Sequence, residues 1–91
     1  MGPWKPITTE AALGVNTGAA SAIGNSRYVR LFNTAAVGTE HLVTLEESGG
    51  TDIGTFTLDG QKEAIIQKDP SDKLFAANAA VMAVGVSINS N

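Results

Sequence analysis

The feature that most limits the fold of this chain is a series of short segments separated by turn-forming residues. Segments in which apolar and polar residues alternate, or apolar residues cluster, lie at residues 27–33, 41–47, 53–58, 62–68, 73–75 and 81–88. Turn chemistry such as Ser48-Gly49-Gly50-Thr51-Asp52 separates them, at intervals of about 8–12 residues. No long segment has the 3.6-residue period of an amphipathic helix. The pattern predicts an all-β fold, a small antiparallel β-sandwich or barrel of about 6–7 short strands.

Alternate residues of a strand point to the same face, so the apolar residues at alternate positions predict the hydrophobic core. The predicted core consists of Val29, Leu31, Val43, Leu45, Phe56, Leu58, Ile66, Val84 and Val86. In the last segment the even positions from Met82 to Ile88 form an apolar face, and the odd positions are small. Asp59-Gly60 predicts a hairpin between the strands on either side, because both residues tolerate positive φ.

The beginning of the chain differs from the rest. Residues 1–19 are rich in Pro, Thr, Ala and Gly, and Pro3 and Pro6 favour extended backbone. We therefore expect an extended N-terminal arm at 1–19, with a short strand at 7–9, before a β-sandwich domain at 20–91 whose last three residues fray. Trp4, the sole tryptophan, either docks into a neighbour's groove or folds back over its own domain.

A second constraint is size. A chain of 91 residues buries only about 60–65% of its unfolded surface, and small domains compensate with disulfides, a metal or oligomerisation. The chain has no cysteine, and one histidine, His41, cannot build a structural zinc site alone. We therefore expect oligomerisation. Only 16% of the residues are charged, which suits burial against a neighbour but also fits a plain, weakly charged surface.

Several function classes are not expected. The net charge is −3 without a basic stripe, which argues against a nucleic-acid partner, and no apolar run is long enough to span a membrane. The start has no signal-peptide core, so Sec export is not expected. Without a phosphate-binding loop, a nucleophile-elbow motif or a second histidine, we predict that the chain is no enzyme and has no cofactor. Asp69 and Asp72 could cup a cation, but turn capping explains them as well.

Four stretches carry a resemblance to a known class of proteins: Ser26–Asn33, His41–Leu45, Gly54–Leu58 and Glu63–Leu74. Together they resemble the strand-and-turn cadence of small virion structural proteins of tailed bacteriophages, notably those of marine and cyanobacterial hosts. The resemblance spans about residues 20–88 and rests on structural features. It implies a virion protein made in the host cytoplasm, a capsid cement or decoration protein, although a tail or head-completion role fits the same cadence.

The resemblance also implies partners. These are other copies of the chain, with a trimer favoured by the threefold symmetry of many decoration sites, and the major capsid protein or other virion proteins. It brings no catalytic residues and no cofactor. The residues expected at the interfaces are Trp4, Pro6, Ile7, Tyr28, Phe32 and Phe75.

The alternative function is a receptor- or carbohydrate-binding sandwich module of a phage tail or fibre. Sugar sites use exposed aromatic rings beside polar groups, and this chain has five aromatic residues. Clustering of Trp4, Tyr28 and Phe32 on one exposed surface of a single chain would favour this binding module. Burial of the same three residues between subunits would favour assembly.

Overall fold

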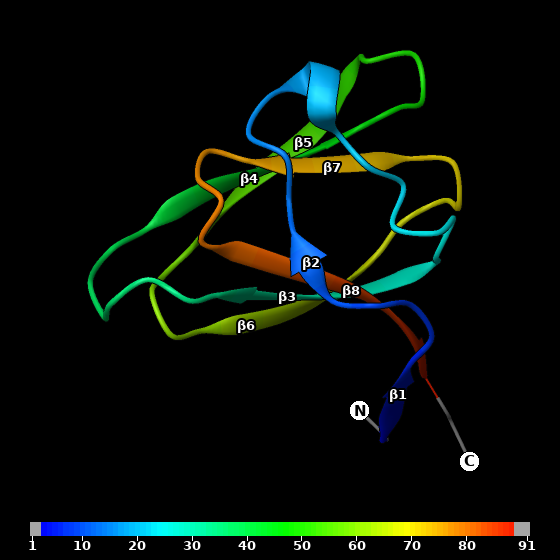
Figure 1. Cartoon of the computed structure of the whole chain (residues 1–91). Helices are drawn as coiled ribbons and strands as arrows, with labels where there is room; N and C mark the ends of the chain where they lie inside the picture. The colour runs from blue at the N-terminus through cyan, green and yellow to red at the C-terminus, as the bar shows by residue number, and fades with distance from the viewer. Residues whose placement is uncertain (1–2, 89–91) are drawn as a thin grey trace.

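The computed structural model describes residues 3–88 as two antiparallel sheets packed face to face (Figure 1). The elements are β1 (Trp4–Pro6), β2 (Ala11–Ala12), a 3₁₀ turn (Thr17–Ala19), β3 (Tyr28–Asn33), β4 (His41–Glu46), β5 (Asp52–Leu58), β6 (Glu63–Gln67), β7 (Lys73–Ala76) and β8 (Val81–Ile88). The larger sheet has the order β1-β8-β3-β6, with β2 also beside β8, and the smaller has the order β5-β4-β7. The sheets do not close into a barrel, so the predicted all-β sandwich is confirmed.

The alternating segments form strands where the sequence predicts them, and the differences lie mainly near the N-terminus. The predicted strand at 7–9 is wrong: this stretch is a link between β1 and β2. Here the hydroxyl of Thr8 accepts a hydrogen bond from Gly85 N at 2.8 Å, so a side chain replaces one backbone partner of β8. Residues 1–2 of the predicted arm and the tail 89–91 lie outside the described residues.

The core lies between the two sheets. Its fully buried apolar members are Leu13, Val29, Leu31, Val43, Leu58, Leu74, Ala76, Val81 and Ala83. Predicted core residues Leu45, Phe56 and Ile66 are partly buried against this cluster. Leu13, Leu74, Ala76, Val81 and Ala83 were not predicted, because the pattern around them is short or made of small residues.

The two faces of β8 are both buried, but in different surroundings. Ala83 lies opposite Leu31 of β3 and joins the core, so the small odd positions face the smaller sheet. Val84 and Val86 are buried, but they lie outside the core cluster, on the other face of the sheet. Their predicted burial is confirmed, although they do not lie between the two sheets. The small odd side chains let β8 approach the smaller sheet closely, which leaves the larger even ones outside.

The hairpin predicted at Asp59-Gly60 is also wrong. The strands on either side belong to different sheets, since β5 pairs with β4 and β6 pairs with β3. The positive φ of this link is at Gln61 (60°), whose side chain donates hydrogen bonds to Thr34 O and Ala35 O at 3.0 Å each. Gly60 is buried, and a Cβ there would overlap the carbonyl of Ala36. The absence of a side chain at Gly60 therefore lets the link between β5 and β6 pass close to the backbone of the link between β3 and β4.

The N-terminal segment is extended and lies against its own domain. β1 and β2 both pair with the same edge of β8, and Leu13 is only 3% exposed. Residues 14–21 then run beside β7: Ala76 N donates to Gly14 O at 3.0 Å, and Ser21 and Leu74 exchange backbone hydrogen bonds of 3.0 and 2.8 Å. Within one chain, this segment therefore closes the open side of both sheets.

We expect Gly60→Ala to lower the free energy of unfolding by about 1–3 kcal/mol, because the added methyl group must displace backbone atoms of the 34–39 link. Gly49→Ala is the matched control, since a Cβ at Gly49 meets nothing within 4 Å and its φ is negative. It should leave stability unchanged or raise it by up to about 1 kcal/mol. Urea unfolding followed by Trp4 fluorescence measures both, and equal effects would contradict the assigned role of Gly60.

Candidate functional site

The candidate site is the surface of the larger sheet that points away from the smaller one. Directly opposed residues of neighbouring strands share a face, so the register identifies its members. We call this surface the outer face, and its residues are Trp4, Pro6, Ala12, Tyr28, Arg30, Phe32, Glu63, Ile65, Gln67, Met82, Val84, Val86 and Ile88. Most of them are apolar or aromatic, although no further sheet or helix of residues 3–88 covers them.

Arg30 is the centre of the outer face. Its guanidinium carbon lies 5.7 Å from the centre of the Trp4 ring and 5.2 Å from that of Phe32. Nε donates to Glu63 at 2.7 Å, and Nη1 lies 3.4 Å from Glu10. A planar cation between two rings and two carboxylates is held by cation–π attraction and charge-assisted hydrogen bonds together. We call Arg30, Trp4, Phe32, Glu10 and Glu63 the Arg30 cluster. Within one chain, its contacts hold the Trp4 ring against its own domain.

Two valines of the outer face, Val84 and Val86, are buried because longer side chains of neighbouring strands cover them. Val84 lies opposite Arg30, and Val86 lies between Tyr28 and Pro6. They are 4% and 1% exposed. The methylene stem of an arginine covers apolar surface while its charged end stays near water. The outer face thus has a closed apolar floor and a rim of aromatic rings, and Trp4 remains 37% exposed.

Four of the six predicted interface residues lie together on the outer face: Trp4, Pro6, Tyr28 and Phe32. Ile7 leaves the strand beside them and is 54% exposed. Phe75 is separate, because it lies opposite Thr44 on the outside of the smaller sheet. Sequence reasoning did not include Arg30, although the shared parity of residues 28, 30 and 32 places it between the two aromatic residues.

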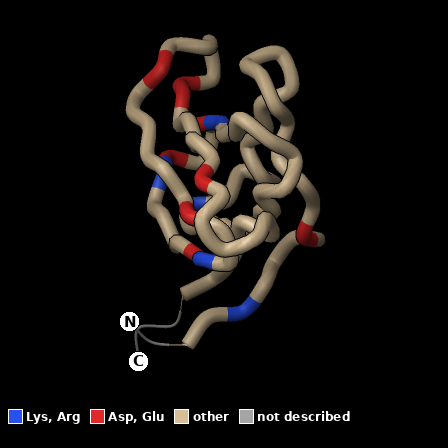
Figure 2. The backbone as a smooth tube through the Cα atoms, turned by 90° about the vertical axis from the view of Figure 1, so that its left-hand side faces the viewer, with Lys and Arg blue, Asp and Glu red and all other residues tan. Residues whose placement is uncertain are grey.

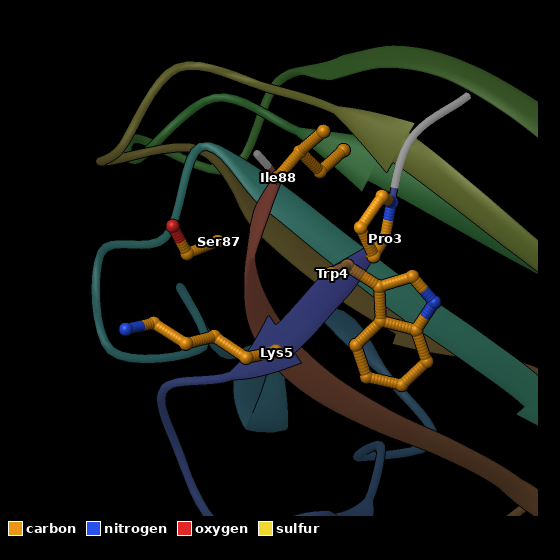
Figure 3. Close-up of a pocket in the computed structure, with 5 residues that line it drawn as sticks. All are labelled: Pro3, Trp4, Lys5, Ser87 and Ile88. Carbon is orange, nitrogen blue, oxygen red and sulfur yellow. The ribbon is translucent and has the colours of Figure 1, made fainter. Parts of the chain in front are cut away.

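A hollow of about 450 Å³ lies next to the outer face, lined by Pro3, Trp4, Lys5, Ser87 and Ile88. Figure 3 shows that the side chains of Trp4 and Lys5 point to opposite sides of β1. The hollow therefore wraps around a sheet edge and does not enclose a ligand. Its five lining residues offer one ammonium and one hydroxyl, and none of the five carries a carboxylate or an imidazole that could activate either.

The turn at residues 69–72, where Asp69 and Asp72 could cup a cation or cap the turn, binds the ammonium of Lys68. Nζ of Lys68 donates to the carbonyls of Asp69 and Pro70 at 3.3 and 3.1 Å, and Lys68 is only 5% exposed. Asp72 accepts from Asp69 N at 3.3 Å and closes the turn. Burial lowers the pKa of Lys68, while the charges of Asp72 and Asp69 raise it, so the net shift is downward.

The described residues provide little support for a catalytic or metal-binding site elsewhere. His41 is half-buried at the start of β4, opposite Leu58. Between residues 3 and 88, no group of three His, Cys, Asp or Glu side chains could hold a metal ion. Lys and Arg lie next to Asp and Glu at several places along the backbone (Figure 2), as in Lys62-Glu63 and Asp72-Lys73. No helix among the described residues is long and apolar enough to cross a membrane.

Comparisons with protein family models, curated proteins and solved structures find no match to this chain. The outer face itself is therefore the basis for assigning a function.

We expect Arg30→Met to lower the free energy of unfolding by about 1–2 kcal/mol. Methionine keeps an apolar stem over Val84 but removes the cation–π contacts, worth about 0.5–2 kcal/mol, and two ion pairs of at most about 1 kcal/mol each. Acrylamide should also quench Trp4 more readily in this variant. Arg27→Met is the control, because Arg27 is exposed beside the same sheet. Equal losses in the two variants would show that the Arg30 cluster contributes nothing specific.

The buried ammonium of Lys68 predicts a pH dependence of stability. Because its folded pKa lies below the usual 10.5, the unfolded chain binds more protons than the folded chain between those two values. The free energy of unfolding should therefore rise with pH across that alkaline window. Lys68→Met should remove this contribution and give a flatter profile in parallel urea titrations. Identical slopes for the two proteins would be inconsistent with a lowered pKa.

Proposed function

We propose that this chain is a structural protein of a phage virion, a capsid cement or decoration protein that docks through the outer face. The observation that carries the proposal is an aromatic and apolar sheet face with an arginine at its centre. The resemblance of residues 20–88 to small virion proteins supplies the setting, and the outer face supplies a means of attachment.

The composition of the outer face supports a protein partner. Trp, Tyr and Arg are the residues most enriched at the energetic centres of protein interfaces, and Trp4, Tyr28 and Arg30 lie close together here. Arg30 already has two carboxylate partners, so a docking surface need not pair it again. A partner would gain apolar contact with Trp4, Phe32 and Met82 without burying an unpaired charge.

The second candidate is a carbohydrate-binding module, and one observation favours it. Trp4, Tyr28 and Phe32 occupy one face of a single chain, beside the polar groups of Arg30, Glu10 and Glu63. Ring faces next to carboxylates and a guanidinium suit a sugar's apolar and hydroxyl surfaces. Tyr28 and Phe32 are only half exposed, however, and this suits edge contacts with a protein better than an open stacking platform.

Particles of the encoding phage, made with and without the gene, test the proposal. Particles lacking the chain should release DNA at a lower temperature, and adding the purified chain should restore their stability. Trp4→Ala should weaken binding to these particles by about thirtyfold, the loss expected for an aromatic hot spot of about 2 kcal/mol.

Phe75→Ala serves as the matched control, because Phe75 lies on the outside of the smaller sheet. It should bind as the unmodified chain does. If the chain is missing from purified particles, or if Phe75→Ala is the damaging variant, the proposal is wrong. Binding of the chain to a glycan array that is lost in Trp4→Ala, without any effect on particles, would establish the carbohydrate-binding function instead.

A further inference from the structure

Free sheet edges invite pairing with another strand, and two edges of this sandwich are protected by the chain itself. At β1, Pro6 has no N–H to offer and Lys5 adds a charge. At β7, residues 14–21 already occupy the outward backbone groups of Leu74 and Ala76. Neither edge is open to a further strand.

The edge at β6 is protected in a different way. The strand is only 5 residues long, and Glu63 begins it with a charge that Arg30 holds at 2.7 Å. Lys62, which is exposed, adds a second charge just before the strand. Charges at a short edge strand are the usual protection against pairing with another chain.

The fourth edge, β5, lacks such protection. It is 7 residues long, and five of its residues are exposed. Between Ile53 and Leu58 it contains neither a charged residue nor a proline, and Ile53 is 52% exposed. A register shift lies beside its Asp52 end, which leaves Gly54–Leu58 in regular pairing with β4. A long, uncharged edge of this kind is suited to strand addition.

Hydrogen-bond directions show which groups β5 offers. Leu42 O accepts from Ala77 N at 2.9 Å, so the backbone groups of Leu42 point toward β7 and away from β5. Thr57 lies opposite Leu42, and its N–H and C=O therefore point to the free edge. The period of two along a strand gives Thr55 the same outward direction. Both threonines thus present an unpaired donor and acceptor at this edge.

We propose that β5 pairs antiparallel with β5 of a second copy of this chain, with Thr55 on the twofold axis. Thr55 would then face Thr55 of the partner subunit and exchange two hydrogen bonds with it. The pair would join two three-stranded sheets into one continuous sheet. The proposed attachment surface lies on the other sheet, so this inference does not depend on it.

The sequence of β5 is complementary to itself in this register. Thr55 is the midpoint of the strand, so pairing there uses its whole length. Gly54 faces Phe56 of the partner subunit, and a Cβ built on Gly54 meets nothing within 4 Å, which leaves room for that ring. Aromatic side chains opposite glycine stabilise edge strands. The one charge, Asp52, lies at the end, far from its own copy.

The test uses opposite charges at the twofold axis. Analytical ultracentrifugation over a concentration series should give the unmodified chain twice the 9.4 kDa mass of one chain. Thr55→Lys and Thr55→Glu should each remain at 9.4 kDa, because like charges directly opposite one another repel. An equimolar mixture of the two variants should regain the doubled mass. Gln67→Lys, at the free edge of β6, is the matched control and should dimerise normally.

A second measurement needs no substitution. The amide hydrogens of Thr55 and Thr57 should exchange more slowly as protein concentration rises, while those of Ile65 and Gln67 on β6 stay unchanged. A monomer at every concentration, a trimer, open-ended aggregates, or a dimer that both Thr55 variants retain would overturn the proposal. Failure of the particle-binding assay alone would leave this mass and exchange behaviour unaffected, so the two proposals fail separately.

Discussion

The whole structure depends on the central position of β8 in the larger sheet. β3 pairs along one side of it, and β1 and β2 pair along the other, so the two ends of the chain are joined by one strand. β8 is also apolar on both faces, with Val81 and Ala83 in the core and Val84 and Val86 beneath the Arg30 cluster. The side chains of neighbouring strands bury Val84 and Val86 although no second sheet lies over them. β8 therefore supplies the apolar base of the outer face.

The N-terminal segment contributes stability that a chain of this size was expected to obtain from oligomerisation. A small chain without disulfides or a metal was expected to obtain stability from neighbours, yet part of that stability comes from inside the chain. Leu13 adds a side chain to the core, and residues 14–21 occupy the backbone groups of β7. Thr17 also donates a hydrogen bond to the carboxylate of Glu46, which is only 1% exposed. Contacts with other proteins are thus free to serve assembly rather than folding alone.

The sequence predicts the strands well because alternation is a local property, but it does not predict which strands become neighbours. Asp59-Gly60 has the composition of a hairpin turn, and only the pairing of β5 with β4 and of β6 with β3 shows that the chain crosses to the other sheet there. Alternation in β8 likewise defines two faces without showing which is internal. The same limit applies to the site: shared parity groups Tyr28 with Phe32, whereas the separation of Phe75 depends on the sheet that β7 joins.

The two proposed contacts have a joint geometric consequence. In an antiparallel pair about Thr55, directly opposed residues share a face, so the twofold axis is perpendicular to the continuous sheet. Both larger sheets then lie on the same side of that sheet, and both outer faces point away from it in the same direction. A dimer of this shape presents two equivalent surfaces to one target, where the second contact forms at high effective concentration. Such bivalent binding suits a partner whose sites repeat at regular spacing, as capsid subunits do, and it would strengthen attachment even if each outer face bound only weakly.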